Sequence, residues 1–84
     1  MTATDTEIAQ TILRLYTGRG AGRTICPSEA ARALHDQNWR SLMPRVRDVA
    51  GVMAKTGKIR ASKKGKPVDP TIARGPIRLG LPED

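Results

Sequence analysis

The sequence predicts an α+β, mostly helical fold: a winged helix-turn-helix of three helices plus a small β-hairpin wing. The first observation is that hydrophobic residues recur at helical spacing in three segments and alternate along the chain after Gly57. The second is the length of 84 residues, which suits a single domain over residues 1–84, with an ordered core of about 5–80 and short polar tails. A small α+β domain with another packing of these elements is the alternative.

The first element is predicted to be a helix over residues 5–17. Thr4 or Asp5 can cap its start, and Gly18 offers a left-handed stop at its end. Its apolar stripe consists of Ile8, Ala9, Ile12, Leu15 and Tyr16. A glycine-rich loop follows and leads to a short extended piece at residues 23–25.

Two further helices are expected in the middle of the chain. Pro27 suits the first position of a helix that runs to about residue 34 or 35, with Cys26 as a weak N-cap. Ser41 is the expected cap of a third helix, which spans residues 42–56 and ends at Gly57. Its buried stripe consists of Leu42, Val46, Val49, Ala50 and Met53, and its opposite, outer face of Arg47, Gly51 and Lys55.

The alternating segments predict the wing. Residues 58–62 place Ile59 and Ala61 on one side, and residues 75–79 place Ile77 and Leu79 on one side. Residues 63–67 contain a glycine and a proline, so we predict a loop there. The two strands then form a hairpin with a long connection.

Several ordered blocks resemble a bacterial family known only as a domain of unknown function, number 3253. The resemblance covers about residues 8–80 and includes Ile-Cys-Pro-Ser-Glu-Ala-Ala-Arg at 25–32. The other blocks are residues 39–40, 46–50, 57–59, 63–70 and 74–78. The resemblance implies a winged-helix-like fold, and it implies neither an activity nor catalytic residues.

The positive charge is concentrated in one part of the chain. The net charge is +7 and the isoelectric point about 10.6. Residues 1–44 carry five basic and four acidic side chains, whereas residues 45–78 carry ten basic and two acidic ones. A basic half beside a nearly neutral half indicates a surface for a polyanion, although lysine and arginine also keep small proteins soluble.

This distribution predicts binding of nucleic acid, with DNA expected and RNA left open. Three lysines within four positions can follow a phosphate backbone, and arginines on the third helix can approach the major groove. The predicted nucleic-acid-binding residues are Lys63, Lys64 and Lys66 in the loop, Arg60, Arg74 and Arg78 beside it, and Arg45, Arg47 and Lys55 on the third helix. The competing interpretation is a solvated hairpin tip whose lysines guard a sheet edge.

Base reading by the third helix is weakly supported. Asp48 and Gly51 share its outer face, no Asn or Gln is present to read adenine, and Arg45 could simply pair with Asp48. We expect Arg32 and Arg40 to cap carbonyls or pack their stems. Trp39 is expected to close the core.

Catalysis is not expected. His35 has no partners at metal-binding spacing, Cys26 has no evident base, and the glycines fit no nucleotide-binding motif, so no metal and no cofactor is predicted. The single cysteine, the polar start and the lack of a long apolar run predict a cytoplasmic protein without a signal peptide or membrane span. The alternative function is a protein-interaction module on the same fold, and a homodimer is left open.

Overall fold

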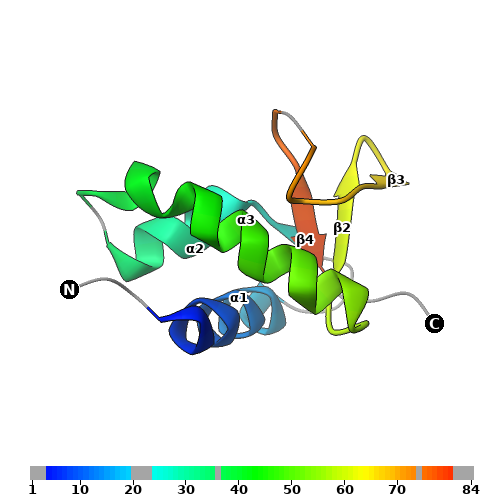
Figure 1. Ribbon diagram of the computed structural model, residues 1–84. Coiled ribbons are helices and arrows are strands. Elements are labelled where there is room, and N and C mark those ends of the chain that lie inside the picture. The colour runs from blue at the N-terminus through cyan, green and yellow to red at the C-terminus, as the bar shows by residue number, and fades with distance from the viewer. Residues whose placement is uncertain (1–3, 20–23, 36, 74, 81–84) are drawn as a thin grey trace.

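Three helices and a four-stranded antiparallel sheet make up the computed structural model, which describes residues 4–19, 24–35, 37–73 and 75–80 (Figure 1). The helices are α1 (Asp5–Arg19), α2 (Pro27–Leu34) and α3 (Trp39–Lys55). The strands are β1 (Thr24–Ile25), β2 (Arg60–Lys63), β3 (Lys66–Pro67) and β4 (Arg78–Gly80). This arrangement confirms the predicted mostly helical α+β fold with a winged-helix-like layout.

Helix α1 begins where a reciprocal pair of hydrogen bonds caps it. The Glu7 amide donates to the Thr4 hydroxyl (3.1 Å), and the Thr4 amide donates to the Glu7 carboxylate (3.1 Å). Such a capping box satisfies amides that have no partner within the helix. The helix continues to Arg19, so the predicted stop at Gly18 is wrong: Gly18 is helical.

Gly18 is therefore a position at which alanine should stabilise the protein. A Cβ added there would meet no atom within 4 Å, and alanine favours the helix over glycine by up to about 1 kcal/mol. We expect Gly18→Ala to raise the free energy of unfolding in urea by about 0.5–1 kcal/mol. Gly57→Ala is the control, because Gly57 has a φ of 79° and alanine there should destabilise. A loss of stability in Gly18→Ala would contradict the helical assignment.

The starts of α2 and α3 differ in how well the sequence predicts them. Helix α2 begins at Pro27 as expected, and Glu29 reaches back to accept a hydrogen bond from the Cys26 amide (2.7 Å). Helix α3 begins at Trp39 after Asn38, so the prediction of Ser41 as its cap is wrong. The Ser41 hydroxyl instead donates back to the Asn38 carbonyl (2.7 Å). Pro44 consequently lies inside the helix, where it cannot donate to a preceding carbonyl.

The sheet has the order β1-β4-β2-β3, with β4 between β1 and β2. The register places Leu79 opposite both Ile25 and Ala61, which confirms the predicted pairing of the two wing segments. The prediction of a loop over residues 63–67 is wrong, because Lys63 ends β2 and β3 pairs with it. A Lys64–Gly65 turn joins them, and Pro67 is tolerated because β3 is an edge strand.

The core lies between the helices and the inner face of the sheet. Its buried residues are aliphatic apart from Tyr16, whose hydroxyl donates to the Lys58 carbonyl (3.2 Å). The largest fully buried side chains of this core are Ile8, Ile12, Ile25, Val46, Ile77 and Leu79. Trp39 is half-buried and packs against this cluster, as expected for a residue that closes the core. None of the helices in the described ranges combines the length and hydropathy that a membrane span requires.

Candidate nucleic-acid interface

The β2–β3 hairpin gathers three lysines, Lys63, Lys64 and Lys66, which we call the lysine hairpin. Lys64 and Lys66 are exposed and Lys63 is half-buried. The strand register places Lys63 directly opposite Lys66, and like charges in opposite positions destabilise a strand pair. Lys64 has a φ of 52°, the only positive value among the described residues other than glycine. A lysine in this region costs more than glycine or asparagine would.

The lysine hairpin stands away from the helices. Figure 1 shows the turn between β2 and β3 projecting from the body formed by α1, α2 and α3. A Cβ built on Gly75 would lie 3.5 Å from the Lys63 ammonium, so this side chain extends toward the segment that leads to β4. Arg60 is half-buried at the start of β2. Arg74, the remaining predicted residue of this region, lies outside the described residues.

Arg78 connects β4 to β1 through most of its guanidinium group. Nε donates to the Thr24 hydroxyl (2.8 Å), Nη2 donates to the Thr24 carbonyl (2.9 Å), and Nη1 lies 3.3 Å from the Cys26 sulfur. Arginine has five donor hydrogens, so these contacts leave few for a phosphate. The structure therefore gives Arg78 a role in joining the sheet to the start of α2.

Arg47 is held by the segment that precedes β4. Its Nη1 donates to the Ala73 carbonyl (2.7 Å) and lies 3.5 Å from the Pro70 carbonyl, and its Nη2 donates to the Gly75 carbonyl (2.8 Å). A protein-facing guanidinium of this kind cannot also form a bidentate contact with a guanine without breaking these bonds. The predicted base-reading role is thus poorly matched by the geometry around Arg47.

The same segment covers Gly51, so its predicted place on an open outer face is wrong. Gly51 is buried, and a Cβ there would lie only 2.7 Å from the Thr71 methyl group. The signal for this packing was present in the sequence, because a glycine inside a helix often marks a close approach of another chain segment. The exposed residues of α3, which we call its uncovered arc, are Arg40, Ser41, Pro44, Asp48, Val52 and Lys55.

Arg45 pairs with the start of α1. Its Nη2 lies 2.6 Å from the Asp5 carboxylate, whereas the sequence suggested Asp48 as its partner. The two side chains are 39% and 75% exposed, so solvent screens the pair and it contributes about 0–1 kcal/mol. The uncovered arc of α3 therefore carries exposed positive charge at its two ends, Arg40 and Lys55, and none between them.

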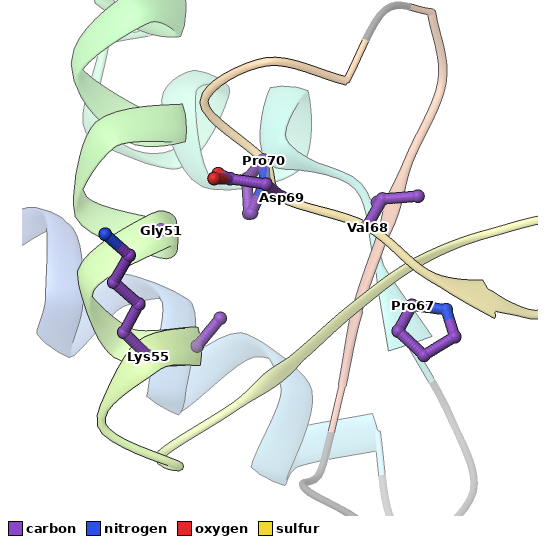
Figure 2. Close-up of a pocket in the computed structure, with 7 residues that line it drawn as sticks. Gly51, Lys55, Pro67, Val68, Asp69 and Pro70 are labelled. Atoms are coloured by element: carbon purple, nitrogen blue, oxygen red, sulfur yellow. The ribbon is translucent and has the colours of Figure 1, made fainter.

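Lys55 lies beside a shallow groove of about 310 Å³ between α3 and the segment after β3. Its walls are Gly51, Ala54, Lys55, Pro67, Val68, Asp69 and Pro70. Figure 2 shows the ends of Lys55 and Asp69 on the two sides of this groove. Hydrogen bonds from the Thr71 side chain and amide lower the pKa of Asp69, and the Lys55 charge adds to this effect. Asp69 is consequently a carboxylate that opposes phosphate binding at Lys55.

Two further residues singled out in the sequence have structural roles. His35 accepts a hydrogen bond from the Asn38 amide through Nδ1 (3.2 Å), which ties the turn between α2 and α3. Cys26 is half-buried at the start of α2, where its sulfur lies 3.5 Å from the Glu29 carboxylate. In the described part of the chain, His, Cys, Asp and Glu side chains form no group of three or more that could hold a metal ion.

Six of the nine predicted cations fall into two groups. Lys63, Lys64 and Lys66 lie together on one hairpin, and the guanidinium groups of Arg45, Arg47 and Arg78 pair with or donate to other parts of the protein. No curated protein matches the chain. The model of one family, described as "Protein of unknown function (DUF3253)", matches residues 5–82. The chain belongs to this family.

Proposed function

We propose that the protein binds duplex nucleic acid, in the first place DNA, and does so mainly through the phosphate backbone at the lysine hairpin. The observation that carries this proposal is the placement of Lys63 opposite Lys66 with Lys64 at a positive φ between them. Repulsion and backbone strain are both local costs, and local costs of this kind concentrate at functional positions. A phosphate backbone along the hairpin relieves the repulsion between the lysines.

Contact with the phosphate backbone is favoured over base reading because Arg45 and Arg47 of α3 already contact other parts of the protein. Arg47 already donates to backbone carbonyls, and Arg45 pairs with Asp5. The exposed side chains of the uncovered arc include Asp48, which repels phosphate, and Val52. The protein should therefore bind duplexes of different sequence with similar affinity.

A duplex is favoured over a single strand because the chain lacks accessible aromatic rings. Proteins that bind single strands stack successive bases on aromatic side chains. This chain has one Trp, one Tyr and no Phe. Tyr16 is 4% exposed, and the half-buried ring of Trp39 lies under two guanidinium groups.

Fluorescence anisotropy of a labelled random-sequence duplex tests the proposal. With about 4–6 phosphates neutralised, wild-type affinity should fall about 10²–10³-fold between 50 and 200 mM salt. A variant with Lys64→Glu and Lys66→Glu should lose at least about tenfold in affinity at 50 mM salt. The control is Arg14→Glu with Lys58→Glu, which reverses two exposed charges elsewhere and should bind nearly as the wild type.

Two outcomes would overturn the proposal. Binding that does not change with salt would exclude a mechanism based on phosphate contacts. An equal loss in the hairpin variant and the control variant would mean that net charge alone determines affinity. Circular dichroism of each variant verifies that the loss does not come from unfolding.

Protein interaction is the second candidate function. Two large aliphatic side chains of the described residues are exposed, Val52 at 63% and Ile72 at 76%. Single exposed apolar residues are common on protein surfaces, so this observation ranks below the lysine hairpin. A partner that copurifies at high salt would favour this function. Under either function we propose a non-catalytic protein of the cytoplasm, a reducing compartment that a chain with one cysteine suits.

A further inference from the structure

The turn between α2 and α3 holds a second cluster of positive charge. The guanidinium carbons of Arg32 and Arg40 lie over the Trp39 ring, at 4.4 and 4.7 Å from its centroid. Arg32 comes from the last turn of α2, and Arg40 follows Trp39 in the first turn of α3. Both arginines are exposed, whereas the ring that both contact is half-buried against the core. We call these three residues the arginine–tryptophan cluster.

The contact with the ring orients the two guanidinium groups without occupying their hydrogen-bond donors. An arginine over an aromatic face interacts through its flat surface, so the N–H groups around its edge remain directed outward. Within the described part of the chain, neither Arg32 nor Arg40 forms a hydrogen bond or an ion pair. Arg47 and Arg78 differ in this respect, because their donors are satisfied by the protein itself.

The two charges are also close enough to repel each other. Both distances are measured to one centroid, so the charges lie within the Debye length of about 10 Å at 0.1 M salt. An anion between or beside them removes this repulsion. Guanidinium groups bind phosphate oxygens through paired, charge-assisted hydrogen bonds, which makes phosphate a well-matched ligand.

The chain segment that follows the lysine hairpin packs on the face of α3 that also holds Arg40. Arg40 and Gly51 are eleven residues apart, which is close to three helical turns, so they share one face of α3. The segment that follows β3 packs on this face, with the Thr71 methyl group next to Gly51. The eleven residues from Arg40 to Gly51 correspond to a rise of roughly 17 Å along α3, so the two basic regions lie at different heights along this helix. Between them Pro44 and Asp48 provide no positive charge.

We propose that Arg32 and Arg40 are a second phosphate-binding site, which contacts the same duplex as the lysine hairpin. This inference rests on the proposed function and specifies how the duplex is held. The duplex is fixed at the two ends of α3, and the acidic and apolar middle of the helix lies over it without reading bases. Nucleic-acid duplexes are stiff over this distance, so one duplex can reach both regions.

The test compares the salt dependence of duplex binding in three proteins: the wild type, a variant with Arg32→Gln and Arg40→Gln, and a control with Arg14→Gln and Lys58→Gln. Both variants lose two positive charges, but the control loses them away from the cluster. The arginine variant should bind at least about tenfold more weakly at 50 mM salt, and its slope of log affinity against log salt should be smaller by about 2. The control should keep the wild-type slope.

Tryptophan fluorescence gives an independent measurement on the wild-type protein. Trp39 is the single tryptophan, so a change in its emission on addition of unlabelled duplex reports on the cluster. We expect a saturable change with the same midpoint as the anisotropy titration. If the arginine variant does not fold, the change in Trp39 emission decides whether the duplex contacts the arginine–tryptophan cluster.

The binding results distinguish a failure of this inference from a failure of the proposed function. If the wild type binds, the lysine-hairpin variant is weakened, and the arginine variant matches its control with Trp39 emission unchanged, the second site does not exist and the proposed function stands. If the wild type does not bind a duplex at any salt concentration, both are wrong.

Discussion

Replacing Leu79 with alanine is expected to lower the free energy of unfolding by about 2–5 kcal/mol. Leu79 has no exposed surface and lies in β4, opposite both Ile25 and Ala61. The substitution removes apolar contacts on both sides and leaves a cavity in the middle of the sheet. A domain of this length has about 4–13 kcal/mol of stability in total, so the variant should be partly unfolded near 37 °C.

Urea denaturation followed by circular dichroism measures this effect. The matched control is Leu15→Ala, because Leu15 is only half-buried at the edge of the core and α1 favours alanine. Leu79→Ala should shift the midpoint more than Leu15→Ala while the slope of the transition stays the same. A smaller shift in Leu79→Ala would mean that the sheet is not part of the cooperative core.

Arg47→Ala is expected to destabilise the protein by about 2–3 kcal/mol. The guanidinium of Arg47 contacts the carbonyls of Pro70, Ala73 and Gly75, and hydrogen bonds from a charged donor contribute about 1.5–3 kcal/mol each. The expected total is smaller than the sum of these values because part of the site is exposed and water can replace some of the bonds. We also expect faster hydrogen exchange in the segment before β4, at the amides of Ile72 and Ala73, which donate to the Asp69 carbonyl.

Arg45→Ala provides the control on the same helix. Its exposed pair with Asp5 should contribute no more than about 1 kcal/mol, and its loss should leave the exchange of the segment before β4 unchanged. The duplex-binding assay tests the alternative in which Arg47 reads bases. If Arg47→Ala keeps its stability but changes the preference for base sequence, Arg47 reads bases and its carbonyl contacts are secondary.

The elements of the fold follow from local patterns where those patterns are unambiguous. The helical spacing of Ile8, Ile12 and Tyr16 and the proline at position 27 locate α1 and α2 closely. The start of α3 could not be located as well, because both Asn38 and Ser41 are residues that cap helices. Only the three-dimensional structure shows that the Ser41 hydroxyl donates back to the Asn38 carbonyl from inside the helix.

The candidate site depends more on distant contacts, and these are not visible in the sequence. The grouping of Lys63, Lys64 and Lys66 could be predicted because the three lysines are neighbours in the chain. The hydrogen bonds of the Arg47 guanidinium could not be predicted. Their acceptors lie 23 to 28 residues away and are backbone carbonyls, which every residue has. The register that places Lys63 opposite Lys66 depends on a two-residue turn, and Pro67 argued against a strand there.

The position of β4 in the sheet also determines the order in which the fold can assemble. The contacts between β1 and β4 join residues 54 positions apart, as in the bond from Arg78 to Thr24, whereas the helices need only local contacts. Closing such a long loop is entropically costly and slow, so helix formation should precede sheet formation. During synthesis, β1 cannot pair with β4 until residues 78–80 have left the ribosome. Until then the strand edges of β1 and β2 that pair with β4 are unpaired, and unpaired strand edges promote aggregation.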